Sequence, residues 1–156
     1  MIVADSTILI TLINIDEFEV LELFIKSIII TDEVYQEVSK RVYAKNFIDK
    51  KIESGFIMIE NYHDKQLFSE INTILDIGES ASITLALEKN LPLIIDEKKG
   101  RRFAKSQGVV VVGLVGILSF LYLEKKVSKE KSLNIIDKLN SSNFHISKKL
   151  LKMILS

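Results

Sequence analysis

Two aspartates each follow a short apolar run that is typical of a buried β-strand. Asp5 follows Ile2-Val3-Ala4, and Asp96 follows Leu93-Ile94-Ile95. If the two strands run parallel, their carboxyl ends meet at one edge of the sheet, where ligands bind in open α/β folds. Asp is also a favoured N-cap residue, and helical patterns follow both positions. Capping is therefore the simpler explanation for either residue taken alone.

Two glutamates could join these aspartates. Glu37 borders a helical stripe of three valines that begins at Val34. A carboxylate there either pairs with Arg41, four residues further on, or ligates a metal ion, and the pattern leaves both explanations open. Glu79 begins a later helical segment, where the helix dipole favours an acid; the alternative is a further carboxylate at the same edge of the sheet.

Together, Asp5, Glu37, Glu79 and Asp96 would form a ligand set made only of oxygen atoms, since the sequence has no cysteine and only two histidines. Mg²⁺ and Mn²⁺ prefer such ligands. Crowded acids repel one another, so at least one should have a raised pKa when no cation is bound. A metal ion held this way activates water for attack on a phosphodiester. Neither a Gly-rich phosphate loop nor a G-x-S-x-G motif occurs in the sequence.

The elements that must position these acids alternate along the chain. Apolar runs typical of strands stand at residues 2–4, 28–30, 56–59, 93–95 and 109–112. Helical patterns stand at 6–14, 17–25, 32 to about 53, 64–75, 78–90 and 98–107, and from 113 onward with a break at 141–143. The strands are apolar throughout, which indicates burial on both faces. We therefore predict an α/β fold of three layers, with a central, mostly parallel sheet flanked by helices.

Length and charge limit the organisation further. The 156 residues suit one domain, which we assign to residues 1–124, with 125–156 as its helical C-terminal extension. The net charge is zero, but from Lys125 onward eight lysines face two acids, giving +6, and the rest of the chain carries −6. Positive and negative surface are thus segregated along the sequence.

Membrane insertion and secretion are not expected. The longest uncharged apolar stretch, residues 109–123, is shorter than the roughly 20 residues that a membrane span needs. The N-terminus lacks the positive segment of a signal peptide, so we predict a cytoplasmic protein. Residues 113–123 are apolar nearly all round, which predicts a buried helix or a dimer interface.

Four motifs, taken in order, resemble those of PIN-domain nucleases. They are Val3-Ala4-Asp5-Ser6-Thr7, Val34-Tyr35-Gln36-Glu37-Val38, Gly78-Glu79-Ser80-Ala81-Ser82-Ile83 and Ile94-Ile95-Asp96-Glu97. The stretches 75–80 and 96–104 resemble a bacterial and archaeal branch of that family, whose members are nucleic-acid-binding proteins or VapC-like toxins. The ending 139–147 is similar to the helix-turn-helix region of that branch. The resemblance covers nearly the whole chain.

The resemblance implies a Mg²⁺- or Mn²⁺-dependent ribonuclease that hydrolyses RNA phosphodiester bonds. By motif position, the catalytic and metal-binding acids would be Asp5, Glu37, Glu79 and Asp96. Thr7 would match a Ser/Thr that supports the site, and either Glu97 or a water would complete the metal shell. Family members are often toxins neutralised by a cognate antitoxin, and many are homodimers. The alternative is an inactive module that binds nucleic acid or a partner protein.

Two arginines follow Asp96 in the sequence. Arg101 and Arg102 stand in the next predicted helix and either reach RNA phosphates as forked donors or form a solvated helix face. The positive C-terminal segment would likewise suit RNA or an acidic segment of a partner.

Overall fold

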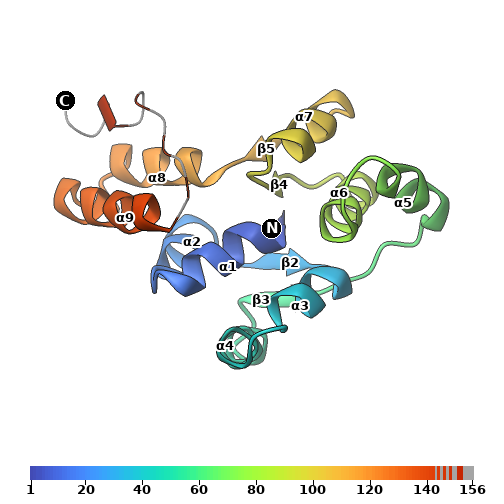
Figure 1. Ribbon diagram of the computed structural model, residues 1–156, viewed down its shortest axis with the longest axis horizontal. Helices are drawn as coiled ribbons and strands as arrows, with labels where there is room; N and C mark the ends of the chain where they lie inside the picture. Colours follow the sequence, from blue (N-terminus) through green and yellow to red (C-terminus); the bar gives the residue numbers. More distant parts are fainter. Residues whose placement is uncertain (143, 145, 147, 149–150, 153–156) are drawn as a thin grey trace.

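The computed structural model describes residues 1–142, 144, 146, 148, 151 and 152. A five-stranded sheet with the order β3-β2-β1-β4-β5 forms its centre (Figure 1). The strands are β1 (Ile2–Ala4), β2 (Ile28–Ile30), β3 (Ile57–Ile59), β4 (Leu93–Ile94) and β5 (Val111–Val112). Every neighbouring pair is parallel. The predicted α/β fold with a parallel central sheet is confirmed.

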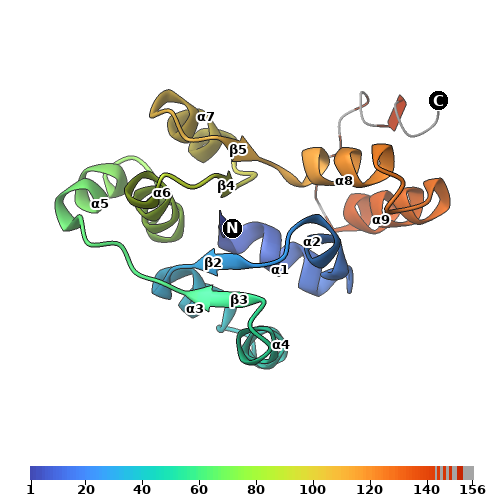
Figure 2. The same cartoon turned by 180° about the vertical axis from the view of Figure 1, so that it is seen from behind.

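The helices cover both faces of the sheet, as the front and back views show (Figures 1 and 2). They are α1 (Ser6–Asn14), α2 (Glu19–Phe24), α3 (Asp32–Val38), α4 (Val42–Glu53), α5 (Lys65–Asn72), α6 (Ile77–Lys89), α7 (Lys98–Ser106), α8 (Leu114–Leu123) and α9 (Lys129–Ser141). Ile2 and Ala4 of β1 belong to the hydrophobic cluster that includes residues of α1, α3 and α8. Val3 belongs to the opposite cluster, with residues of α5, α6 and α7. Successive side chains of a strand point to opposite faces, so both must be apolar.

The prediction of a single helix from residue 32 to about 53 is wrong. Helix α3 ends at Val38, and α4 begins at Val42 after Arg41 has taken up an extended backbone conformation (φ −108°, ψ 132°). Val42 does not continue the buried stripe, because 76% of it is exposed. Two shorter helices bury their own apolar faces where one straight helix would turn away from the sheet.

The C-terminal segment is also interrupted earlier than expected. The predicted helix from residue 113 to 141 is broken between α8 and α9, where Lys125 has a left-handed conformation (φ 59°). Ser128 then caps α9 by accepting a hydrogen bond from the backbone N–H of Lys131. Ile135 and Leu139 of α9 are buried in the same cluster as β1. Helix α9 therefore belongs to the core.

Part of the C-terminal resemblance cannot be compared with the structure. Residues 143, 145 and 147 of the predicted helix-turn-helix region lie outside the described residues, as do 149, 150 and 153–156. Among the helices that the structure does describe, none combines the length and the apolar character that a membrane span requires.

Candidate functional site

The two aspartates lie at the same edge of the sheet, as the sequence predicts. Strands β1 and β4 are parallel neighbours, and Asp5 and Asp96 follow closely on their carboxyl ends. The backbone N–H of Asp5 donates to the carbonyl of Ile94 at 3.0 Å, which extends the ladder to the base of the site. Neighbouring parallel strands therefore bring together two residues that are 91 positions apart.

Asp5 is deeply buried and does not cap the helix that it precedes. It occupies the N-cap position of α1, which the structure describes in full, but its side chain makes no capping hydrogen bond. Only 2% of the residue is exposed, and within the described part of the chain Oδ1 has no hydrogen-bond partner. Capping therefore does not explain Asp5. A buried carboxylate oxygen without a partner is unfavourable unless a cation or a proton compensates it.

Glu37 lies beside Asp5 because Gly78 leaves room for both carboxylates. A Cβ atom placed on Gly78 would lie 3.0 Å from Oε2 of Glu37, 3.7 Å from Oδ1 of Asp5 and 3.8 Å from Oδ1 of Asp76. The break between α3 and α4 removes the helical i, i+4 geometry on which a pair between Glu37 and Arg41 depended. Three elements thus place three carboxylates around one glycine. Asp76 is not among the site residues predicted from the sequence, although its position just before Gly78 and Glu79 was a usable signal.

Glu79 has a structural role and one free oxygen. Its backbone N–H donates to Oδ1 of Asp76 at 2.8 Å, and its Oε2 accepts from the backbone N–H of Asp76 at 3.4 Å. This is a capping box at the start of α6. The other oxygen, Oε1, is buried and has no partner among the described residues. It faces the first turn of α7, since a Cβ atom on Gly100 would lie 2.8 Å from it.

Electrostatic repulsion and burial act together on these acids. Burial, followed by the charges of Asp76, Glu37 and Glu97, raises the pKa of Asp5 to about 7 against a backbone hydrogen bond that lowers it. Burial, then the charges of Asp76 and Asp5, raises the pKa of Glu79 to about 7, with a smaller contribution from Glu97. Raised pKa values are the predicted signature of crowded acids. We call Asp5, Glu37, Asp76, Glu79 and Glu97 the acidic cluster.

Asp96 has different partners. Its Oδ1 and Oδ2 share a hydrogen bond from the backbone N–H of Leu114, at 3.3 and 3.2 Å, and so satisfy the first turn of α8. Nη1 of Arg101 lies 3.6 Å from Oδ1. Burial raises the pKa of Asp96, and both the Leu114 hydrogen bond and the Arg101 cation act against that rise. Asp96 therefore does cap a helix, but that helix is α8 and not α7, which is the next helix after Asp96 in the sequence.

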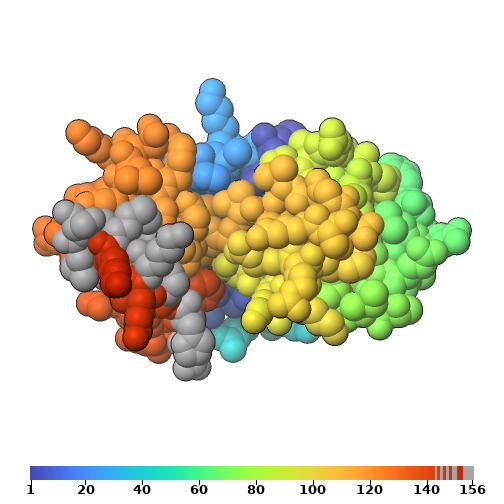
Figure 3. All heavy atoms as spheres, turned by 90° about the horizontal axis from the view of Figure 1, so that it is seen from above, coloured from blue at the N-terminus to red at the C-terminus, as the bar shows by residue number. Residues whose placement is uncertain are grey.

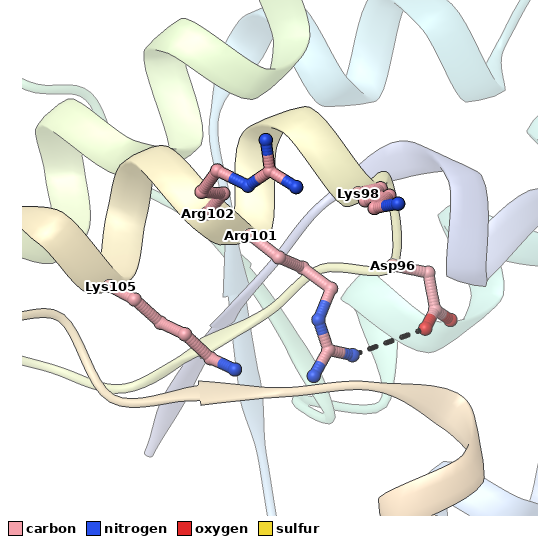
Figure 4. Close-up of a pocket in the computed structure, with 5 residues that line it drawn as sticks. All are labelled: Asp96, Lys98, Arg101, Arg102 and Lys105. Atoms are coloured by element: carbon pink, nitrogen blue, oxygen red, sulfur yellow. Dashed lines mark ion pairs between the residues drawn. The ribbon is translucent and has the colours of Figure 1, made fainter.

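Basic side chains of α7 line a cavity of about 430 Å³ together with Asp96 (Figure 4). Its lining residues are Asp96, Lys98, Arg101, Arg102 and Lys105, which we call the basic pocket. Arg101 extends toward Asp96, and a dashed line marks their ion pair, whereas no ion pair is drawn to Arg102 (Figure 4). The helix is on the surface of the molecule, in yellow in Figure 3. Only Arg101 of the two arginines is thus tied to the strand edge.

Two further predicted residues are exposed. Thr7 lies in the first turn of α1, and its supporting role stays a prediction. Glu97 is the N-cap residue of α7, a helix that the structure describes completely, and its side chain makes no capping hydrogen bond there. The carboxylate of Glu97 is therefore not committed to its own helix.

The chemistry of the acidic cluster fits a hard divalent cation. Every donor is a carboxylate oxygen, and Oδ1 of Asp5 and Oε1 of Glu79 are buried without partners in the described structure. Within the described residues, no group of three or more His, Asp or Glu side chains is already arranged to hold a metal ion. A cation would have to draw these mutually repelling side chains together.

Comparison with known proteins bears on this site. No curated protein matches the chain significantly. A family model described as a PIN domain matches residues 1–156. PIN domains are generally nucleases, which are hydrolases, and they usually use divalent metal ions. The match spans the whole sequence and agrees with the parallel sheet and the acids at its edge, so the chain belongs to the PIN-domain family.

Proposed function

We propose that this protein is a metal-dependent endoribonuclease that hydrolyses RNA phosphodiester bonds at the acidic cluster. The observation that carries the proposal is a pair of buried carboxylate oxygens, Oδ1 of Asp5 and Oε1 of Glu79, at the carboxyl edge of a parallel sheet. Neither oxygen has a hydrogen-bond partner among the residues that the structure describes. A purely structural pair of buried acids would be expected to have its oxygens satisfied. A site that receives a cation has a reason to leave them free.

Asp5, Glu37 and Glu79 would hold Mg²⁺ or Mn²⁺, with a fourth carboxylate from the end of β4, where the sequence predicts Asp96. When bound, the ion supplies an activated water and stabilises the leaving oxygen of the phosphodiester. The chain keeps Asp5 and Glu79 away from bulk water, which strengthens their attraction for a cation. Because both have pKa values near 7, cation binding competes with protons below neutral pH.

The basic pocket supports a polyanionic substrate. Four basic side chains of one helix line this pocket beside Asp96 at the strand edge, namely Lys98, Arg101, Arg102 and Lys105. Guanidinium and ammonium groups neutralise phosphates along a nucleic-acid backbone. The same surface suits the alternative function, an inactive module that binds nucleic acid or an acidic partner.

The biological setting that we propose is a toxin-like role with a cognate antitoxin, in the cytoplasm and as a homodimer. Helix α8 buries Leu114, Ile117, Leu118 and Leu121, but leaves Phe120 and Leu123 41% and 63% exposed. Exposed large apolar side chains of this kind suit an interface between proteins. Light scattering checks the dimer, and a purely monomeric protein at working concentration would contradict it.

Cleavage assays test the enzymatic proposal. Wild-type protein, Asp5→Asn, Glu79→Gln and the control Asp137→Asn, an exposed acid on α9, are incubated with single-stranded RNA and Mn²⁺. We expect cleavage by the wild type and the control, and loss of cleavage in both cluster variants and in EDTA. Equal cleavage by all four proteins would indicate a contaminant and contradict the proposal.

Two further measurements separate the alternatives. A parallel set with single-stranded DNA distinguishes a ribonuclease from a deoxyribonuclease acting through the same carboxylates. Salt-dependent RNA binding without cleavage, unaffected by metal or by Asp5→Asn, would favour the inactive binding module.

A further inference from the structure

The two adjacent acids at the end of β4 belong to different environments. Asp96 lines the basic pocket and contacts the backbone N–H of Leu114 and the guanidinium of Arg101. Its negative charge is therefore matched by a helix N-terminus and by a cation. Asp5 and Glu79, in contrast, each keep one buried oxygen without a partner among the described residues.

Glu97 lies at the start of α7, the helix whose first turn borders the acidic cluster. It begins α7, and the unpaired Oε1 of Glu79 lies against the first turn of that helix at Gly100. The charge of Glu97 also acts on both Asp5 and Glu79. In α7, which the structure describes completely, the Glu97 side chain accepts no capping hydrogen bond.

We infer that Glu97, and not Asp96, supplies the fourth carboxylate of the acidic cluster, while Asp96 is a positioning residue that holds Arg101 in the basic pocket to bind a phosphate of the substrate. This inference rests on the proposed function. The two adjacent acids after β4 then have different roles. Glu97 binds the cation, and Asp96 positions the arginine that binds the phosphate.

The surroundings of Arg101 fit this role. A Cβ atom on Gly113 would overlap Nη1 of Arg101 and would lie 2.5 Å from Oδ1 of Asp96, so the glycine allows the arginine to reach the strand edge. Nη1 of the Arg101 guanidinium lies 3.6 Å from Oδ1 of Asp96. A guanidinium carries five N–H donors, so others remain for a phosphate oxygen.

Metal binding tests the first half of the inference. Mn²⁺ affinity is measured by calorimetry for the wild type, Asp5→Asn, Asp96→Asn and Glu97→Gln. We expect Asp5→Asn and Glu97→Gln to weaken Mn²⁺ binding by about tenfold or more, and Asp96→Asn to retain an affinity close to that of the wild type. If Asp96→Asn weakens binding as much as Asp5→Asn while Glu97→Gln does not, the inference is wrong and Asp96 is the ligand.

RNA binding tests the second half, in EDTA so that metal-dependent cleavage cannot occur. Asp96→Asn and Arg101→Ala should each lower the affinity and reduce the slope of log affinity against log salt by about 0.7, the value for one phosphate contact on a single strand. In the double variant, Asp96→Asn should have little further effect, because it acts through Arg101. Additive losses would contradict the positioning role.

A methyl group at Gly113 provides a test that leaves every charge in place. Gly113→Ala is compatible with the backbone conformation there (φ −105°) but displaces Arg101 from Asp96. We expect weaker RNA binding with unchanged Mn²⁺ affinity. Gly116→Ala is the matched control, since its added Cβ would make only an ordinary contact, 3.7 Å from Val112. Equal RNA affinities of the two alanine variants would overturn the inference.

The two proposals fail in different ways. A wild-type protein that neither binds Mn²⁺ nor cleaves RNA would contradict the proposed function. A wild-type protein that does both, with the order of Asp96 and Glu97 reversed in the metal measurement, would contradict only the inference.

Discussion

Glu17 accepts a hydrogen bond from Nζ of Lys138 at 2.8 Å, although the two residues are 121 positions apart in the sequence. Nζ of Lys131 lies at the same distance from the same oxygen. Only 3% of the Glu17 side chain is exposed. The acidic body and the basic C-terminal segment thus meet at the buried carboxylate of Glu17. Two of the eight lysines that the sequence offered to a partner instead hold α9 in place.

Removing this carboxylate should destabilise the fold. Glu17→Gln is expected to lower the free energy of unfolding by about 1–2 kcal/mol at pH 7, a value reduced because both lysines are nearly half exposed. Urea denaturation measures the change. Burial acts to raise the pKa of Glu17, but the hydrogen bonds and charges of Lys131 and Lys138 outweigh it and lower the pKa below 4.5. The stabilisation that Glu17 provides is therefore present above pH 4.5 and is lost as the pH falls through the lowered pKa of the folded state. Glu124→Gln, an exposed acid after α8, is the control and should change stability little.

Asp5 should make stability depend on pH in the opposite sense. Burial raises its pKa from 3.8 to about 7, so between these values the folded state binds the proton more tightly than the unfolded state. The contribution of Asp5 to the free energy of unfolding should therefore fall as the pH rises from 4 to 7. At pH 8 it should be on the order of 4 kcal/mol lower than at pH 4. Asp5→Asn should be more stable than the wild type at pH 8 in EDTA, with little difference near pH 4. Thermal denaturation of both proteins across this pH range measures the effect, with Asp137→Asn as control. A stability difference between Asp5→Asn and the wild type that does not change with pH would show that Asp5 does not cause the pH dependence.

Divalent cations should relieve the same repulsion. Because a ligand that binds only the folded state stabilises it, Mn²⁺ at about 100 times its dissociation constant should add about 2.7 kcal/mol. Denaturation with Mn²⁺ and with EDTA should show this gain in the wild type, and a much smaller gain in Asp5→Asn and Glu79→Gln. The same gain in all three proteins would place the ion elsewhere.

Gly100 should be sensitive to a single added methyl group. Its Cβ would lie 2.8 Å from both Oε1 of Glu79 and Cδ1 of Ile95, too close for either neighbour to stay in place. We expect Gly100→Ala to weaken Mn²⁺ binding about tenfold without the loss of any carboxylate. Calorimetry measures the affinity, and Gly116→Ala is again the control. An unchanged affinity would mean that the position of Oε1 is unimportant for the metal.

The local sequence determined most of the architecture. Strands that are apolar on both faces, separated by helical patterns, were enough to predict the parallel sheet, because a strand buried on both sides needs helices on both sides. The same reasoning placed Asp5 and Asp96 at one edge, since parallel strands share the direction of their carboxyl ends. The family motifs selected Glu37 and Glu79 as well, and both glutamates lie in the acidic cluster.

Only the tertiary structure decided what each acid contacts. The break after Val38 separated Glu37 from Arg41, and the packing of α6 brought Asp76 beside Asp5. Asp96 contacts Leu114 and Arg101, and Glu17 pairs with lysines more than a hundred positions away. These pairings depend on which segments meet when the core closes, and on which individual oxygen atoms are then shut off from water. The spacing of residues along one segment predicts neither the partners nor the buried oxygens, because the partners come from elements that meet only when the chain folds.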